Sequence, residues 1–272
     1  MPPALSLIIV DYLSRPEIDS ALRSIGRFEP EAEVIVSSNS PYDERQKTEL
    51  VSAFPGVRFS WNDANLGYAG GVNRGLAIAT GRVVGILNPD VELVGSVGAE
   101  LGRAFQQVPE VGLIGPRVLD ESGRTSSSCR RFFSPVYVMA KFTPFGALPT
   151  AKRLIGHVLM SDFDRSSFRL VDWISGGAMF GRADAIAQVG GMDERYFLYM
   201  EDVDWCRRFW EVGWSVAYVP NVAVMHRAKH AGTRRGVRGL FSQPTRRMLA
   251  SYWKYLVKNG IRTRLASRED SR

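Results

Sequence analysis

Acidic residues suited to acid–base chemistry gather in one stretch, Asp193 to Phe209, where they alternate with aromatic residues. Asp202 stands directly before the segment 203–212, which has the pattern of a helix and is followed by Gly213. Burial among aromatic side chains and a neighbouring acid such as Glu201 raise the pKa of a carboxyl, while a helix N-terminus lowers it. Asp202 is therefore a candidate general base. An aspartate at this position is also a common helix N-cap, and both roles stay open.

A second candidate is Asp90, which follows a buried strand predicted over 83–87, within the triplet Asn88-Pro89-Asp90. A carboxylate there suits Mg²⁺ or Mn²⁺, which take one or two protein carboxylates and add water and phosphate oxygens. His226 ends the strand-like run 222–225, and an Asp with a His from another strand end would suit the same ions. A simple turn and a structural histidine are the alternatives. The Cys and His spacing typical of zinc sites does not occur.

Polar residues follow each of four predicted strands, over 4–10, 33–36, 57–60 and 83–87. They are Asp11; Ser37, Ser38 and Asn39; Asn62 and Asn65; and Asn88 and Asp90. Open α/β sheets bind ligands in the crevice at these strand ends. Asn, Asp and Ser also form turns, but four such clusters in register favour a ligand crevice. A further segment, Trp173 to Ala178, contains two glycines that would let a ligand approach the backbone, or would simply form a turn.

Helical patterns over 16–25, 43–53 and 70–79 separate these strands, and we expect Ser14 to cap the first helix. Alternating strands and helices predict a mostly parallel α/β sheet. The glycine-rich run Gly67 to Gly75 does not spell the dinucleotide motif, and no phosphate-binding loop occurs. Segment 120–172 is less regular, and we expect it to form a substrate-facing half with mobile loops.

Length and composition place the chain among ordinary globular proteins, with one large domain or two small ones. Of its 272 residues, 45% are hydrophobic and 23% charged, which excludes a disordered chain. No run approaches the ~20 apolar residues of a membrane-spanning helix. We expect no secretory leader. With only Cys129 and Cys206, we expect no disulfide scaffold and a reducing, cytoplasmic setting.

The net charge of +7 is unevenly distributed along the chain. From His226 onward, thirteen Lys and Arg residues oppose two acids, which gives +11 there and −4 for the first 225 residues. A helix predicted over 244–258 has a hydrophobic stripe flanked by basic residues: Met248, Leu249, Tyr252, Trp253, Leu256 and Val257, beside Arg246, Arg247, Lys254 and Lys258. Such a helix can bind an anionic membrane surface or pack on the body. No nucleic-acid-binding motif accompanies the charge, so we expect no nucleic acid as partner.

Together these motifs resemble those of the inverting family 2 glycosyltransferases, and most of all the bacterial rhamnosyltransferase-like branch, which builds cell-surface polysaccharide. The resemblance spans about residues 5–230 and rests on Asn65 to Gly75, Asn88-Pro89-Asp90, Trp173 to Ala178, Asp193 to Phe197, Glu201 to Asp204, and His226. It implies a GT-A fold, with a single mixed, mostly parallel sheet flanked by helices. The transferase domain would cover 1–230, and 231–272 would be a basic amphipathic helical tail.

The resemblance also implies roles for individual residues. Asp202 would be the catalytic base, Asp90 a ligand of a Mg²⁺ or Mn²⁺ cofactor, and His226 a further ligand as in some members. The remaining expected contacts are Asp11, Ser37, Ser38, Asn65, Asn73 and Asn88 for the nucleotide-sugar donor, and Trp173, Gly176, Gly177 and Glu201 for the acceptor or the transferred sugar. One departure is that Ser37-Ser38 stands where the family commonly has Asp-Asn, whose Asp contacts the nucleobase.

The implied function is an inverting transfer of a sugar to a glycan or polyprenyl-linked acceptor. dTDP-rhamnose is the leading expectation for the donor, and UDP-sugars stay open. The enzyme would be cytoplasmic and peripheral at the inner face of the plasma membrane. One alternative is a nucleotidyltransferase, although residues 5–15 lack the glycine-rich, basic loop that it needs. Another is a catalytically silent module that binds a nucleotide or glycan, whose acids would not converge on one cleft.

Overall fold

The first strand is apolar on both faces because helices cover both sides of the sheet that contains it. In β1 (Leu5–Asp11), Leu7 and Ile9 pack in one hydrophobic cluster with α1 (Arg15–Phe28) and α4 (Gly98–Gln107). Ile8 and Val10 point the other way, into a cluster with α3 (Gly67–Leu76), α7 (Ala183–Val189) and α8 (Glu201–Glu211). This period of two follows from strand geometry, and burial on both faces is usual for parallel strands.

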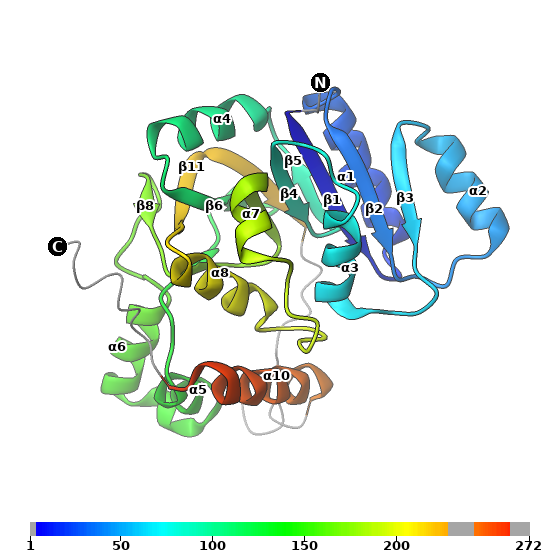
Figure 1. The fold of residues 1–272 in the computed structure, drawn as a ribbon. Helices are drawn as coiled ribbons and strands as arrows, with labels where there is room; N and C mark the ends of the chain where they lie inside the picture. Colours follow the sequence, from blue (N-terminus) through cyan, green and yellow to red (C-terminus); the bar gives the residue numbers. More distant parts are fainter. Residues whose placement is uncertain (1–3, 228–241, 262–272) are drawn as a thin grey trace.

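The computed structural model describes residues 4–227 and 242–261, and within them nine strands form one mixed sheet (Figure 1). Eight strands run in the order β3-β2-β1-β4-β10-β6-β11-β5, and β8 pairs with β11. The bounds are β2 (Glu33–Ser38), β3 (Val57–Trp61), β4 (Val83–Leu87), β5 (Val91–Leu93), β6 (Val111–Leu119), β8 (Arg169–Leu170), β10 (Ala178–Arg182) and β11 (Ser215–His226). The strands β1, β2, β3, β4, β6 and β11 are mutually parallel, whereas β10, β5 and β8 run antiparallel to them.

The predicted alternation of strands and helices is confirmed up to residue 87. Each predicted strand and helix is present, and the ends of every element lie within three residues of the prediction. The second helix is α2 (Glu44–Ala53). Ser14 does precede α1, but its side chain makes no capping bond and instead donates to Asp11, so the predicted cap is wrong. Segment 120–172 is more helical than expected: it contains β7 (Cys129–Arg130), α5 (Pro135–Phe142), η1 (Pro144–Ala147) and α6 (Pro149–Val158).

The glycine-rich run packs α3 closely against the sheet. A Cβ atom at Gly71 would lie 2.5 Å from Val10 Cγ1, and one at Gly75 would overlap Ile8. Any larger residue at either position would push α3 away from β1. The glycines therefore serve helix–sheet packing, one of the general uses of a residue without a side chain.

The last described helix, α10 (Gln243–Asn259), packs on the body next to α8 (Figure 1). Tyr252 and Tyr255 are buried, and Ser251 donates to the carbonyl of Leu198 at 2.9 Å. The predicted stripe is therefore partly wrong, because Trp253 and Val257 are exposed by 68% and 71% while Tyr255 lies inside. The division at residue 230 stays a prediction, since residues 231–241 and 262–272 lie outside the described residues.

Charged side chains join α10 to α8. Lys258 Nζ lies 2.8 Å from carboxylate oxygens of both Asp193 and Asp204. Asp204 is fully buried and also pairs with Arg208 at 3.0 Å.

No helix in the described part of the chain is long and apolar enough to cross a membrane. Cys129 and Cys206 are both buried and unbridged, as expected.

Replacing Lys258 by Met should destabilise the protein, because the buried carboxylate of Asp204 loses one of its cationic partners. Removing one member of a buried ion pair typically costs several kcal/mol, and Arg208 remains, so we expect a loss of ~2 kcal/mol. The measurement is the free energy of unfolding in urea. Arg246→Met, an exposed position on the same helix, is the matched control and should change it by less than ~0.5 kcal/mol. Equal effects of the two substitutions would contradict the prediction.

Candidate active site

Strand direction gathers the candidate residues at one edge of the sheet. Because β1, β2, β4 and β11 are mutually parallel, Asp11, Ser38, Asn88 and His226 follow or end strands at the same edge. Strand β10 is antiparallel and pairs its first residue, Ala178, with Leu87, the last residue of β4. The Asn88 N–H donates to the Gly177 carbonyl at 2.9 Å, which fixes the glycine segment beside the Asn88-Pro89-Asp90 turn.

The structure brings Asp90 and His226 into direct contact. The register of β5 on β11 places His226 opposite Val91, so His226 Nε2 lies 3.0 Å from Asp90 Oδ1. Both side chains are about one quarter to one third exposed. In residues 4–227 and 242–261, no group of three or more His, Cys, Asp and Glu side chains could enclose a metal. One carboxylate and one imidazole open to solvent nevertheless fit a hard divalent cation that completes its shell with phosphate oxygens and water.

Asp202 lies in the first turn of α8, and backbone N–H groups hold its carboxylate. Oδ2 accepts from the Gly176 N–H at 3.0 Å, and Oδ1 accepts from the Val203 N–H at 2.8 Å. Burial raises the pKa of Asp202, and these two hydrogen bonds and the charge of Arg130 oppose the rise. The N-cap position belongs to Met200, because the helix begins at Glu201. The N-cap alternative for Asp202 is therefore wrong.

The backbone before α8 has a conformation that side chains disfavour. Tyr199 and Met200 have φ angles of 71° and 73°, in the left-handed region that ordinary residues rarely adopt. Such residues cost ~1–3 kcal/mol each and gather at functional sites. Here the two residues with positive φ directly precede Glu201 and Asp202.

Glu201 and Tyr68 complete a buried cluster around Asp202. Glu201 is 5% exposed, and its Oε2 has no hydrogen-bond partner. Burial and the charge of Asp202 raise its pKa well above the ordinary value. Tyr68 donates its hydroxyl to the Gly176 carbonyl, and burial followed by the charges of Glu201, Asp202 and Asp90 raises its pKa. Tyr68 thus lies within electrostatic reach of all three acids and bonds to the residue that holds Asp202.

The acids of the stretch Asp193 to Phe209 divide into two groups. Asp202 and Asp204 are two residues apart on a helix, so they point to sides separated by roughly 200°. Asp204 faces Lys258 and Arg208, away from Gly176. Hydrogen bonding to Arg195 lowers the pKa of Asp193, and Lys258 adds to this effect. Glu194 is bonded to Asn73, and Asp202 is the acid of this stretch that contacts Gly176.

Asp11 organises the ends of β1 and β2. It is fully buried and accepts from the hydroxyls of Ser14, Ser38 and Ser40 at 2.6–2.7 Å. Ser37 is also fully buried, and its hydroxyl accepts from Asn62. Of the pair Ser37-Ser38, only Ser38 therefore contacts the acid of the first strand, and Ser37 contacts Asn62. Contact of these residues with a nucleotide stays a prediction.

Asn65 and Asn73 make contacts within the protein. The Asn65 side-chain oxygen accepts from the Gly67 N–H at 2.9 Å, which forms the turn before α3. Asn73 bonds to both the N–H and the carbonyl of Met192 and to Glu194, so it holds the segment before α8 against α3. Their roles in donor binding stay predictions.

Trp173, in β9 (Trp173–Ile174), is 5% exposed and donates its indole N–H to the Arg131 carbonyl. The register of β7 on β9 places Arg130 directly opposite it, and the Arg130 guanidinium lies 4.9 Å from the centre of its ring. A cavity of about 190 Å³ borders Arg130 and also His226 and Gly177.

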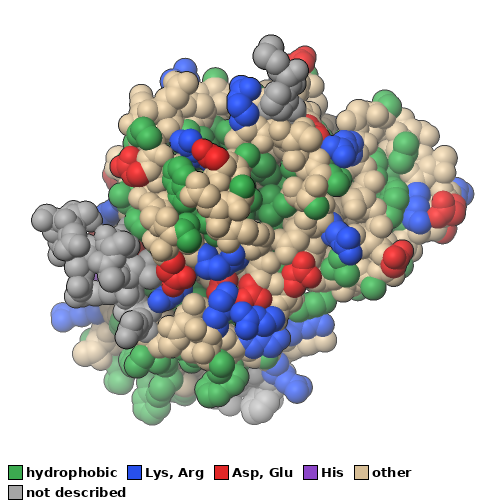
Figure 2. Space-filling view, viewed as in Figure 1, with side chains coloured by type: hydrophobic (Ala, Val, Ile, Leu, Met, Phe, Trp, Pro, Cys, Tyr) green, Lys and Arg blue, Asp and Glu red, His purple; other side chains and the backbone are tan. Residues whose placement is uncertain are grey.

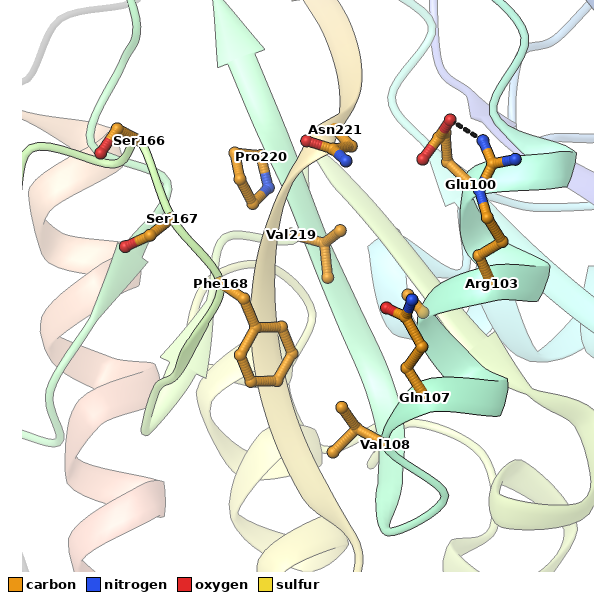
Figure 3. Close-up of a pocket in the computed structure, with 11 residues that line it drawn as sticks. Glu100, Arg103, Gln107, Val108, Ser166, Ser167, Phe168, Val219, Pro220 and Asn221 are labelled. Carbon is orange, nitrogen blue, oxygen red and sulfur yellow. Dashed lines mark hydrogen bonds and ion pairs between the residues drawn. The ribbon is translucent and has the colours of Figure 1, made fainter.

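A larger cavity, of about 630 Å³, lies away from these residues. It is lined by α4, by the segment just before β8, and by the irregular part of β11 (Figure 3). Gln107, Phe168 and Asn221 are examples from these three segments. None of the candidate site residues borders it. Its size alone therefore does not make it the active site.

Sequence reasoning did not identify Tyr68 and Arg130 as site residues. Tyr68 belongs to the glycine-rich run and could have been singled out as its one aromatic residue. Arg130 carries no comparable signal, because its position follows from the pairing of β7 with β9 across a long segment. The structure gathers Asp90, His226, Asn88, Gly176, Gly177, Glu201 and Asp202 at one edge.

Comparison with solved structures identifies the fold. GalNAc-T7, solved with UDP, GalNAc and Mn²⁺, matches with a TM-score of 0.65 at 17% identity, over 93% of this chain and 48% of that one. The mannosyltransferase PcManGT from Pyrobaculum calidifontis, solved with GDP-Man and Mn²⁺, matches with a TM-score of 0.54 at 16% identity, over 85% and 59%. The chain thus spans only part of each structure, and the likeness shows the fold, which is GT-A.

Sequence comparison gives the family. An N-acetylglucosaminyl-diphospho-decaprenol L-rhamnosyltransferase of Mycobacterium tuberculosis is 33% identical over 253 residues, which cover 86% of this chain and 79% of the relative. Rhamnosyltransferase WbbL of Escherichia coli is 36% identical over 92 residues, which cover 34% and 33%. Residues 6–153 match the family described as "Glycosyl transferase family 2". The chain therefore belongs to glycosyl transferase family 2.

Proposed function

We propose that this glycosyltransferase moves a sugar with inversion from a nucleoside diphosphate sugar to an acceptor hydroxyl, with Asp202 as the general base. The observation that carries the proposal is the position of the Asp202 carboxylate. It is half-buried, held by the Gly176 and Val203 N–H groups, and lies at the same sheet edge as Asp90 and His226. That convergence favours an enzyme over a silent binding module. The missing glycine-rich, basic loop after β1 argues against a nucleotidyltransferase.

The proposed reaction is a single in-line displacement. The acceptor oxygen attacks the anomeric carbon and forms the new C–O bond, while the bond from that carbon to the diphosphate oxygen breaks. Asp202 takes the hydroxyl proton, and the nucleoside diphosphate leaves with the bonding electrons. A carboxylate whose pKa is raised by burial is a stronger proton acceptor. The two backbone N–H donors hold it in one orientation, which is required for efficient transfer.

Glu201 has a different role in this proposal. Its pKa lies well above the ordinary value, so it stays protonated where Asp202 is ionised, because two adjacent buried carboxyls resist ionising together. A protonated Glu201 can donate a hydrogen bond to a sugar hydroxyl at the oxygen that has no protein partner. It would thus orient the sugar next to the base.

Asp90 and His226 are the residues that would hold Mg²⁺ or Mn²⁺. When bound, the cation supplies positive charge against the charge that develops on the leaving diphosphate. The donor atoms of the two side chains fit such an ion, and the two solved structures described above contain Mn²⁺. Asn88 lies beside Gly177 and would contact the donor. Asp11, Ser37, Ser38, Asn65 and Asn73 would form or support the nucleotide pocket.

The names of the relatives support a choice of substrates. Two of them are rhamnosyltransferases, and one name specifies an N-acetylglucosaminyl-diphospho-decaprenol acceptor. We propose dTDP-rhamnose as the donor, with UDP-sugars as the alternative, and a polyprenyl-diphosphate-linked glycan as the acceptor, in the synthesis of cell-surface polysaccharide. Trp173, Gly176, Gly177 and Glu201 would border the acceptor or the transferred sugar.

A lipid-linked acceptor would place the enzyme at the cytoplasmic face of the plasma membrane. On α10, Trp253 and Val257 are exposed one helical turn apart, near the basic Arg246, Arg247 and Lys254. Val136 and Met139 of α5 are also exposed. Figure 2 shows hydrophobic side chains at this end of the molecule, beside Lys and Arg side chains. Apolar side chains rimmed by positive charge suit the interface of an anionic membrane.

Replacing Asp202 by Asn should preserve donor binding and abolish transfer, because the amide keeps the size of the side chain but cannot take a proton. General-base catalysis contributes about 10²–10⁴-fold to a rate, so we expect a loss of at least 10²-fold in kcat. Asp184→Asn, at a surface acid paired with Arg182, should leave the rate unchanged. Undiminished turnover in Asp202→Asn would contradict the assignment.

Nucleoside diphosphates should raise the melting temperature in a cation-dependent way. With dTDP at ~100 times its Kd, we expect an increase of roughly 5–10 °C in the presence of Mn²⁺ or Mg²⁺, and a smaller one with GDP. Asp90→Asn and His226→Ala should remove the part of the shift that depends on the cation. The control is Asp120→Asn, at a surface loop. An equal shift in a chelator and in Mn²⁺ would refute a metal at Asp90.

Vesicle sedimentation should detect the proposed membrane surface. We expect the full chain to sediment with phosphatidylglycerol vesicles and to remain in solution with phosphatidylcholine vesicles. The double change Trp253→Ser and Val257→Ser should weaken binding at least tenfold, because each side chain contributes ~1.5–3 kcal/mol when buried in an apolar environment. Val51→Ser with Val212→Ser removes two exposed apolar side chains from other helices and should have no effect. Identical binding of both double variants would exclude α10 as the contact.

A further inference from the structure

Arg130 is a half-buried cation at the edge of the site whose hydrogen-bonding capacity is largely unused. Its Nε is buried and has no hydrogen-bond partner. Its one described hydrogen bond, from Nη2 to the Ser127 carbonyl, is 3.5 Å long, which is at the limit for such a bond. Within residues 4–227 and 242–261, no carboxylate forms an ion pair with it.

Two neighbouring arginines have more and shorter hydrogen bonds than Arg130, although the Nε of Arg165 is likewise buried without a partner. Arg131 donates to the His157 carbonyl at 2.8 Å and lies 3.9 Å from a carboxylate oxygen of Asp162. Arg165 donates to the carbonyls of Phe163 and Leu159 at 2.8 and 2.9 Å. A guanidinium has five N–H donors, and leaving them unmet away from water costs free energy. Arg130 is therefore the arginine of this region that is built to meet a group from outside the protein.

Two contacts fix the position of the Arg130 guanidinium. The strand pairing of β7 with β9 sets its backbone opposite Trp173, and the guanidinium stacks over the indole at 4.9 Å. The indole is itself held by the Arg131 carbonyl. Stacking on an aromatic face leaves the in-plane N–H groups free to form hydrogen bonds. The charge is thus held in one place without being neutralised.

The guanidinium borders the cavity of about 190 Å³ beside the proposed reaction centre. His226, Ser126, Ser175 and Gly177 line the same cavity. Whole small-molecule sites usually occupy ~300–1,000 Å³, so this volume suits one polar group of a substrate rather than a nucleoside. The other charged candidates nearby, Asp90, Glu201 and Asp202, are acids, so Arg130 supplies the positive charge in this part of the described site. Its charge lowers the pKa of Asp202.

We propose that Arg130 binds a phosphate of a diphosphate-bearing substrate in this cavity. The inference rests on the proposed function, because the diphosphate belongs either to the nucleotide-sugar donor or to a lipid-linked acceptor. A planar guanidinium matches two phosphate oxygens at once, which gives both charge and orientation. The stacking on Trp173 would fix the position of the Arg130 guanidinium. It would thereby also fix the distance of the bound diphosphate from Asp202.

The test measures binding and does not depend on turnover. Isothermal titration calorimetry on the full chain with Mg²⁺ uses three probes: dTDP, farnesyl-diphosphate-linked N-acetylglucosamine, and octyl N-acetylglucosaminide, which has no phosphate. Arg130→Met should raise the Kd of one diphosphate probe at least tenfold, since charge-assisted hydrogen bonds are lost. Arg130→Lys should recover a part of the affinity. The glycoside should bind as to the unaltered protein, and the exposed Arg124→Met should change nothing.

The probe that loses affinity identifies the source of the diphosphate. A change for dTDP assigns Arg130 to the donor, and a change for the farnesyl compound assigns it to the acceptor. Unchanged Kd values for both diphosphates, or an equal loss for the phosphate-free glycoside, would overturn the inference. If the unaltered protein binds neither diphosphate, both this inference and the proposed function fail. If Arg130→Met weakens binding while the unaltered protein transfers no sugar, only the proposed function fails.

Discussion

The hydrogen bond from the Gly176 N–H to Asp202 joins the two halves of the site, and much of the surrounding structure serves it. It connects the first turn of α8 to the segment between β9 and β10. A Cβ at Gly176 would lie in van der Waals contact with Asp202 Cβ, at 3.4 Å. Tyr68 contacts the same residue, because its hydroxyl donates to the Gly176 carbonyl. The glycine packing that brings α3 close to β1 therefore also places Tyr68 against the base.

Placing the adjacent acids Glu201 and Asp202 away from water costs free energy. Ion pairs on the opposite side of α8 offset this cost. The left-handed backbone at Tyr199 and Met200 adds to the cost. Lys258 on α10 binds Asp193 and the buried Asp204, so the negative charge on that side of α8 is compensated. Among the basic residues of α10, Lys258 thus anchors α8, whereas Arg246 is exposed.

Sequence patterns predicted the N-terminal half of the fold well because its strands are buried on both faces and its helices have clear ends. They failed where a partner distant in the chain decides the outcome. Ser14 precedes a helix, yet Asp11 takes its hydroxyl. Tyr255 lay outside the predicted stripe, yet α10 buries it against Arg207 of α8. For the candidate site, motif order singled out Asp90, Asp202 and His226 as candidates, whereas the position of Arg130 depends on the β7–β9 register, which no local pattern specifies.

The acids between Asp193 and Asp204 show why residue type alone could not separate chemistry from structure. All of them stand in one aromatic stretch, and each would suit a base or an ion pair equally well. Their partners decide: Asp204 meets a lysine that lies more than fifty positions further along the chain, while Asp202 meets only N–H groups. A carboxylate that lacks a cationic partner keeps a raised pKa, and one that has such a partner is a poor base. Helix α10 therefore separates the acids by their partners, because Lys258 pairs with Asp193 and Asp204 and not with Asp202, the proposed base.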